Sequence, residues 1–458
     1  MTALMVIPGI LAQIGSVFMQ YIDASMVGHL GSAQAASVGL VSSSIWLLCG
    51  LGICLNVGHY VQISQFVGAG QLQLARNLVR QSYLTSMAVS LFILLGACLI
   101  SDRLPHMLGG DEEICADASV YFLIYCFSVP FMQVNMLSTG ILQGAGSMKL
   151  PGALNILRCL LDVVFNFLLI FDTATYRAGA FELTVPGFGM GVAGAALGTV
   201  LAEFSIAVFM VLAVTKFNPR LRAAPEERFA WRWRHFSRAA RLALPMGFEH
   251  CLICFAMVVS VVIVATLNSD SVAAHSFAIT AESFCYMIAY GISSSASAMM
   301  GQTIGAQRRD IARRLARTVV TFGVVVVGLA SVLMYVAAPG MMAILTPDQT
   351  IQNYGVTALR TVAWAEPLFA ASIVASGLLR GAGDTLGPSV ISCSCMWLIR
   401  LPLSFPLAWA LGLYGVWVAM SIQLCITGAL LLLRLKRGKW LYCTKKEELS
   451  GEGTGEGI

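Results

Sequence analysis

Four polar residues recur along one apolar segment near the start of the chain. They are Gln13, Ser16, Gln20 and Asp23. Their spacings of three, four and three residues place them on one face of a helix. A carboxyl group in an apolar setting favours its protonated form, and no basic residue lies within a helical turn of Asp23. We therefore expect Asp23 to take up and release a proton.

A second polar stripe lies on a later apolar segment, where Arg158, Asp162 and Asn166 are spaced by four residues. Thr199, on the next apolar segment, is expected beside them if consecutive helices pack together. Carboxylate, amide and hydroxyl oxygens are ligands for hard cations. The expected proton or cation site is therefore Asp23, Asp162, Asn166 and Thr199, and these would be metal ligands only for sodium. An intrahelical ion pair between Arg158 and Asp162 that serves packing alone is the alternative.

The second half of the chain carries carboxylates, aromatic rings and an arginine within apolar segments. Such a set suits an organic cation, which gains from charge neutralisation and from cation–π contact. We expect Arg400 to pair with one of the acids. The residues expected to line a substrate cavity are Gln20, Arg158, Glu249, Glu282, Tyr286, Trp364, Glu366 and Arg400. The alternative is that the histidines and glutamates of this half join helices through hydrogen bonds.

No catalytic constellation accompanies these groups. Serine, histidine and aspartate residues cannot be grouped into a triad, and the Gly-Ala-Gly turns lack the strand and the lysine of a phosphate-binding loop. The 13 cysteines are mostly placed in apolar segments and support neither a metal cage nor a disulfide framework. The sequence therefore predicts that the chain is not an enzyme and needs no cofactor.

The composition requires a lipid environment. Of 458 residues, 58% are hydrophobic and 11% are charged, whereas soluble domains are about 25% charged. This excludes a water-soluble enzyme and a nucleic-acid-binding protein. A bilayer needs about 20 apolar residues for each spanning helix. Twelve apolar runs meet that requirement, and they cover residues 5–28, 35–66, 75–101, 115–142, 150–172, 190–215, 238–266, 272–303, 310–338, 353–379, 388–411 and 414–436.

Basic residues predict the orientation of these twelve helices. The loops after even-numbered helices, together with the C-terminal segment, hold 23 of the 28 Lys and Arg residues. Loops on the cytoplasmic side of a membrane carry this excess. Both termini are therefore expected on the cytoplasmic side, in a multi-pass protein of the inner (plasma) membrane.

The chain repeats itself at an offset of 237 residues. The segment from Gly140 to Gly146 matches that from Gly377 to Gly383, and Pro130 matches Pro367. Six helices separate the copies, so the halves have the same orientation and substrate sites are expected between them. The predicted divisions are an N-lobe (1–217), a basic cytoplasmic linker (218–237), a C-lobe (238–440) and a disordered tail (441–458).

Several of these segments together resemble the multidrug and toxic compound extrusion (MATE) transporters. The opening Ile7-Pro-Gly-Ile-Leu-Ala-Gln13, followed by Asp23-Ala-Ser-Met-Val-Gly-His-Leu-Gly31, is similar to the first helix of that family. Gln143-Gly-Ala-Gly146 and Arg380-Gly-Ala-Gly-Asp-Thr385 resemble its turns after helices 4 and 10. The similar segments extend over nearly the whole chain and occur in the family's order.

The resemblance implies two six-helix lobes in a V shape and the exchange of cationic or amphipathic drugs for protons or sodium. It places Asp23 at the coupling aspartate of the first lobe, and Thr199 at a polar ligand on helix 6. On helix 5, bacterial members have Asn, three residues and then Asp-Pro, whereas here Asp162 precedes Asn166 and no proline follows. Other branches carry acids on helices 7 and 10, near which Glu249 and Glu366 lie.

Two other functions remain open at this stage. A flippase for lipid-linked sugars would have a related architecture, but a more cationic cavity is expected for a pyrophosphate than one containing Glu249, Glu282 and Glu366. A membrane-embedded enzyme would need a clustered catalytic set or metal ligands, and the sequence shows neither. A receptor or structural protein would have no use for the acids in both halves. The favoured prediction is a monomeric antiporter that exports small organic cations.

Overall fold

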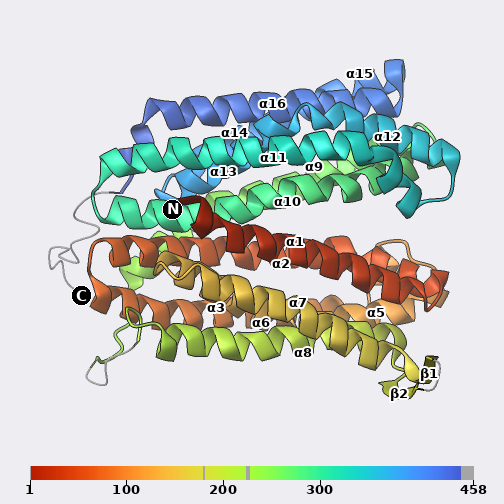
Figure 1. Cartoon of the computed structure of the whole chain (residues 1–458), viewed down its shortest axis with the longest axis horizontal. Helices are drawn as coiled ribbons and strands as arrows, with labels where there is room; N and C mark the ends of the chain where they lie inside the picture. The colour runs from red at the N-terminus through yellow and green to blue at the C-terminus, as the bar shows by residue number, and fades with distance from the viewer. Residues whose placement is uncertain (1, 179–180, 223–226, 445–458) are drawn as a thin grey trace. The chain divides into compact units, whose positions relative to one another are not determined.

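The computed structural model describes residues 2–178, 181–222 and 227–444, and long helices dominate it (Figure 1). The helices of the first half are α1 (Thr2–Gly28), α2 (Ser32–Gly68), α3 (Leu72–Ile100), α4 (Leu104–Met107), α5 (Glu112–Cys126), α6 (Val129–Gly144), α7 (Lys149–Ile170), α8 (Gly191–Leu212) and the π-helical η1 (Ala213–Phe217). Those of the second half are α9 (Trp233–Ala265), α10 (Ser269–Gly305), α11 (Arg309–Leu345), α12 (Gln349–Ala363), α13 (Glu366–Gly381), α14 (Leu386–Cys395), η2 (Met396–Arg400), α15 (Leu401–Leu411), α16 (Leu413–Arg437) and η3 (Lys439–Tyr442).

Ten helical segments of the described chain are long and apolar enough to cross a membrane, or up to twelve if each of two bent pairs is one span. The pairs are α5 with α6, bent by 41°, and α12 with α13, bent by 59°. Pro130 and Pro367 lie in the first turns of α6 and α13, where proline ends the preceding helix but is compatible with a new one. The predicted all-α membrane fold is confirmed, with two spans that are broken rather than continuous.

One connection differs from the prediction and another agrees with it. Between α7 and α8 the chain forms an antiparallel hairpin of β1 (Asp172–Ala178) and β2 (Phe181–Phe188). Apolar runs predict spans but say little about a short connection between them, so the hairpin was missed. The Gly-Ala-Gly segments are tight turns, as predicted: Gly146 and Gly383 have φ of 90° and 94°, a region that favours glycine.

The chain forms two compact units. One comprises residues 15–60 and 75–236, and the other comprises residues 1–14, 61–74 and Ser237 onward. Helices α1 and α2 therefore contribute residues to both units. The lobe and linker boundaries stay predictions; residues 223–226 of the linker and 445–458 of the tail lie outside the described residues.

Each unit has its own apolar core, and apolar side chains also cover its outside. The first unit packs around Val41, Ala118 and Phe122, and the second contains Trp417 within its largest cluster. Exposed side chains of α3 include Leu99, at 84% of its full accessible area. Apolar groups on such a surface are compatible with contact with lipid tails rather than water.

The ends of α2 and α10 meet through glycines within the second unit. A Cβ atom added to Gly68 would overlap the backbone carbonyl of Gln302, and one added to Gly305 would overlap that of Gln65. The two glycines are 237 residues apart, as are the two glutamines. The repeat therefore places a glycine on each helix at the point where the two backbones approach most closely.

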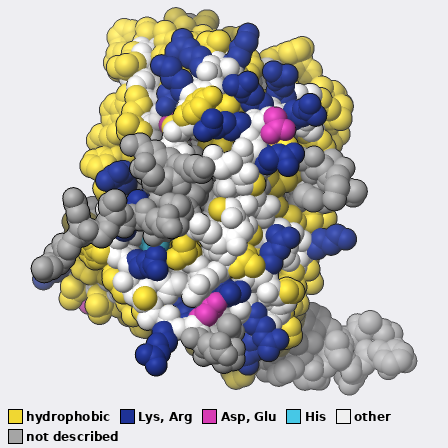
Figure 2. Space-filling view, turned by 90° about the vertical axis from the view of Figure 1, so that its left-hand side faces the viewer, with side chains coloured by type: hydrophobic (Ala, Val, Ile, Leu, Met, Phe, Trp, Pro, Cys, Tyr) yellow, Lys and Arg dark blue, Asp and Glu magenta, His cyan; other side chains and the backbone are white. Residues whose placement is uncertain are grey.

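Basic side chains gather at one end of the helices. Figure 2 shows many Lys and Arg side chains on this face and few Asp or Glu side chains. Part of the basic linker is bound to α3: Arg76 Nε donates to both carboxylate oxygens of Glu227 (3.0 and 2.9 Å), and Asn77 forms two hydrogen bonds with the backbone of Ala230 (2.7 and 3.0 Å). These hydrogen bonds attach the described segment around Glu227 and Ala230 to its own unit.

Candidate functional site

Two aspartates of the first unit are bridged by one amide. Asn166 Nδ2 donates to Asp23 Oδ1 (2.8 Å) and to Asp162 Oδ2 (3.0 Å). The two carboxyl groups interact directly with each other as well. Asp162 has only 1% of its area exposed, whereas Asp23 is partly buried. The structure thus brings together Asp23, Asp162 and Asn166 from two helices that are far apart in the sequence.

Helix geometry accounts for this arrangement. Asp162 and Asn166 are one turn apart on α7 and therefore share a face. That face packs against α8, where Thr199 lies close enough to interact with Asp162. Gly198 leaves room for the Asn166 side chain, because a Cβ atom there would overlap Asn166 Oδ1. The structure thus also places Thr199 beside these residues.

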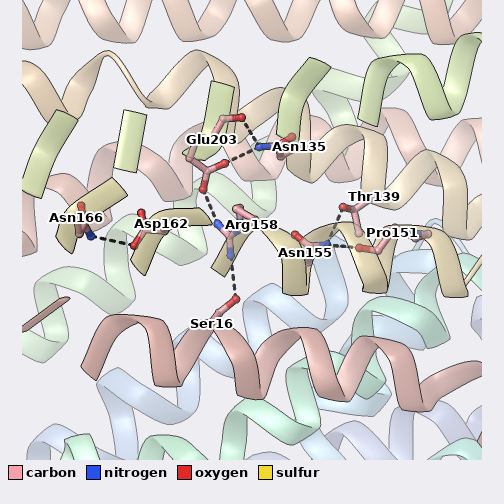
Figure 3. Close-up of polar contacts among 9 residues, drawn as sticks. All are labelled: Ser16, Asn135, Thr139, Pro151, Asn155, Arg158, Asp162, Asn166 and Glu203. Atoms are coloured by element: carbon pink, nitrogen blue, oxygen red, sulfur yellow. Dashed lines mark hydrogen bonds and ion pairs between the residues drawn. The ribbon is translucent and has the colours of Figure 1, made fainter. Parts of the chain in front are cut away.

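Arg158 has a different partner from the one that the alternative interpretation required. Its guanidinium forms an ion pair with Glu203 of α8, rather than with Asp162 one turn away on α7. Nη2 of Arg158 also donates to Ser16 Oγ of α1 (2.9 Å). Asn135 of α6 donates to the other Glu203 carboxylate oxygen (2.6 Å) and to the Glu203 backbone carbonyl (3.0 Å). Figure 3 shows this network beside the pair of Asp162 and Asn166.

Sequence reasoning missed Glu203 and Asn135. Glu203 is the only charged residue in the sequence of α8 and follows Thr199 by four residues, so it lies on the same helix face. That signal was available in the sequence. Asn135 gave no comparable signal, because a single amide in an apolar helix has many structural uses.

Several buried polar atoms of this cluster lack a hydrogen-bond partner among the described residues. They are Asp162 Oδ1, Asn166 Oδ1, Asn135 Oδ1 and Arg158 Nε. Buried polar groups usually have partners, and oxygens left without one can receive a proton, a cation or water. The arrangement can therefore hold a small cation or a proton.

A second pair of carboxyl groups lies in the other unit. Glu282 of α10 and Glu366, the first residue of α13, interact directly and are almost fully buried. Neither Glu366 oxygen has a hydrogen-bond partner in the described part of the chain. Arg400, at the end of η2, interacts electrostatically with Glu282. His275 packs edge-on against Trp417, 5.7 Å between ring centroids.

Five further residues were expected to line the substrate cavity, and their contacts differ from those of Glu282, Glu366 and Arg400. Glu249 of α9 accepts hydrogen bonds from Arg380 Nη2 (2.8 Å) and Ser389 Oγ (2.6 Å), so an arginine already balances its charge. Trp364, with 80% of its area exposed, packs against Tyr335.

Tyr286 packs against Tyr290 and Phe369. Gln20 is exposed on α1 and Arg158 lies in the first unit's network. Within the second unit, Glu249 and Trp364 thus have partners other than the pair of Glu282 and Glu366.

Comparisons with known proteins agree with this architecture. A family model described as MatE matches residues 8–168 and again residues 245–405, two stretches that start 237 residues apart, as the internal repeat predicts. Probable multidrug resistance protein NorM of Thermotoga maritima is 23% identical over 424 residues, covering 91% of this chain and 88% of that protein. The protein of the same name from Halalkalibacterium halodurans is 25% identical over 444 residues, covering 94% and 92%.

Solved structures share the fold. An outward-facing multidrug resistance MATE family transporter has a TM-score of 0.87 and 19% identity, covering 97% of this chain and 96% of that chain. A MOP superfamily transporter from Pyrococcus furiosus has a TM-score of 0.88 at the same identity and coverage. At these identities the likeness establishes the arrangement of the backbone and leaves the chemistry to the side chains described above.

Proposed function

Because the chain belongs to the MatE family, we propose that it is a secondary active efflux transporter that exports cationic or amphipathic organic compounds in exchange for protons or sodium. The relatives named above are multidrug resistance proteins, which supports the export of such compounds. The same relatives agree with the prediction that the chain is not an enzyme. The proposed location is the inner (plasma) membrane, with both termini cytoplasmic, and the proposed state is a monomer.

The bridged pair of Asp23 and Asp162 is the observation that carries the proposed ion coupling. Two buried carboxylates this close repel each other unless a positive charge lies between them. Asn166 directs its Nδ2 donor, not its oxygen, toward both carboxyl groups. A sodium ion would require the amide oxygen to face the carboxylates, with Thr199 as a further ligand. With the amide turned by about 180°, Asn166 Oδ1 would join the two carboxylates as a ligand, so the same residues can serve a proton or a sodium ion.

Coupling follows if the ion and the compound favour different arrangements of the transporter. A ligand shifts such an equilibrium only by the difference between its affinities for the two states. A proton taken up by the aspartate pair would favour one state, and the exported compound would favour the other. Glu282 and Glu366 lie beside each other and Arg400 acts on Glu282, so a cationic group bound near them would favour their ionised forms.

The test is efflux of a fluorescent organic cation from loaded membrane vesicles, with a proton gradient and a sodium gradient imposed separately. The informative variant is Asp23→Asn, which keeps the size of the side chain and removes its charge. The matched control is Asp102→Asn, because Asp102 is an exposed aspartate outside the helices. We expect drive by one ion, lost in Asp23→Asn and kept in Asp102→Asn.

Two results would contradict this proposal. Normal ion-driven efflux by Asp23→Asn would show that the aspartate pair does not couple transport. Efflux driven by neither ion in the unsubstituted protein would direct the search to a lipid-linked sugar or another lipid as the substrate.

A further inference from the structure

Arg158 has two acidic residues within its reach and pairs with only one of them. Asp162 lies one turn away on the same face of α7, a spacing at which ion pairs form readily. The ion pair in the structure joins Arg158 to Glu203 of α8 instead. Contacts with other helices therefore hold the guanidinium away from Asp162.

Glu203 is itself held in place by hydrogen bonds, so its carboxylate stays beside Arg158. One of its carboxylate oxygens accepts from Arg158, and the other accepts from Asn135 Nδ2 at 2.6 Å. Asn135 also donates to the backbone carbonyl of Glu203 at 3.0 Å, so α6 holds the carboxylate in place. On its other side, Arg158 donates to Ser16 Oγ at 2.9 Å. The guanidinium is thus bound to α8 and α1 (Figure 3).

The pairing determines which charges remain unbalanced. Arg158 is the basic residue that acts on both Asp23 and Asp162, and its charge is already balanced by Glu203. Among the described residues, the other titratable groups that interact with these carboxylates are Tyr121 and Tyr125 of α5 and Cys159 of α7. Phenols and thiols are uncharged near neutral pH. The aspartate pair therefore has to obtain a positive charge from outside the protein.

We propose that Glu203 is a positioning residue for ion coupling, which holds Arg158 away from Asp162 and so keeps the aspartate pair available to an external proton or cation. The inference rests on the coupling role proposed above for Asp23 and Asp162. Without the Glu203 carboxylate, Arg158 turns to Asp162, its neighbour one turn along α7. A proton then has to compete with a guanidinium for the same carboxylate.

Two substitutions at opposite ends of the ion pair test this proposal, with the pH midpoint of ion-driven efflux as the readout. In Glu203→Gln the freed guanidinium stabilises ionised Asp162, so we expect the midpoint to move to lower pH by about one unit. In Arg158→Gln the aspartates lose their nearby positive charge, so we expect the midpoint to move to higher pH. The double variant R158Q/E203Q leaves neither charge and should fall between the two single variants. If sodium drives transport, E203Q should raise the half-saturating sodium concentration about tenfold.

A merely structural ion pair would behave differently. Removal of either partner would then lower the amount of folded protein equally and leave the midpoint unchanged, which would overturn the proposal. Glu227→Gln is the matched control, because it breaks the ion pair between Glu227 and Arg76 at the end of the same unit; its midpoint should not move. If E203Q does not accumulate in membranes, Asn135→Ala, which removes the hydrogen bonds that hold the Glu203 carboxylate, should move the midpoint to lower pH, and an unmoved midpoint in this variant would overturn the proposal.

Asp23→Asn, measured alongside, separates the two proposals. Loss of ion drive in Asp23→Asn with unshifted midpoints in E203Q and R158Q refutes the role of Glu203 and leaves the proposed transport function in place. Unchanged ion drive in Asp23→Asn refutes the coupling function itself.

Discussion

The two halves of this protein have a repeated backbone but different charges. Pro130 and Pro367 begin the second member of each bent pair, and Gly146 and Gly383 end it with nearly the same φ. The acids do not follow the repeat: at an offset of 237 residues, the counterpart of Asp23 is Ser260, and that of Glu366 is Val129. The repeat therefore supplies a symmetric framework, and each half carries its own chemistry.

The carboxyl pairs also differ in their surroundings. Asp23 and Asp162 share the Asn166 amide, and the nearest arginine is already paired with Glu203. Glu282 and Glu366 have no bridging amide among the described residues, and Arg400 acts on Glu282 directly. We therefore propose that the first pair binds the coupling ion. For the second pair we propose contact with the exported compound.

The largest expected effect is at the first pair. Asp162→Asn keeps the side chain's size but removes the carboxylate that Asn166 and Asp23 contact. Because coupling free energies of 1 to 3 kcal/mol correspond to about 5- to 150-fold, we expect stimulation of efflux by an ion gradient to fall within that range. The measurement is the ratio of efflux with and without the gradient in vesicles containing equal amounts of protein. If the ion gradient stimulates efflux by Asp162→Asn as much as by the unsubstituted protein, the first pair does not bind the coupling ion.

A second prediction concerns the symmetric framework. Gly68→Ala and Gly305→Ala each place a methyl group against a backbone carbonyl of the other helix, and overpacking of this kind costs about 1 to 3 kcal/mol. We expect similar decreases in thermal stability for the two variants in detergent. Gly247→Ala is the control, because a Cβ atom there meets nothing within 4 Å. A decrease in only one variant would mean that the contact is not symmetric.

The third prediction concerns the second pair. Glu366→Gln removes one buried carboxylate next to Glu282, so we expect the half-saturating concentration of an organic cation to rise about tenfold, as for the loss of one interaction with a charged group. The pH midpoint of transport should stay unchanged. Loss of ion drive at an unchanged half-saturating concentration would instead assign ion binding to the second pair.

Much of the fold could be predicted from the sequence because a membrane requires long apolar helices. The twelve predicted runs correspond to the ten long helical segments and the two bent pairs. The breaks before Pro130 and Pro367 were not predicted, since proline is tolerated within spans where neighbouring groups satisfy the backbone. The hairpin of β1 and β2 was missed because it lies outside any apolar run.

The candidate site could be predicted only in part. Helix periodicity places Asp162 and Asn166 on one face, and the structure brings both to Asp23. Of the substrate residues expected in the second half, Glu282, Glu366 and Arg400 lie together, whereas Glu249 has its own arginine and Trp364 is exposed. Residue type alone does not reveal which charge already has a partner.

The sequence by itself determined the spans, the repeat and the helix faces, because these depend on composition and on spacings within a single helix. Only the tertiary structure decided the partner of Arg158. Asp162 is its neighbour one turn away, yet the fold brings Glu203, 45 residues away, into the ion pair. Packing of α7 against α8 and the hydrogen bonds from Asn135 select that partner, and no local spacing encodes contacts between helices.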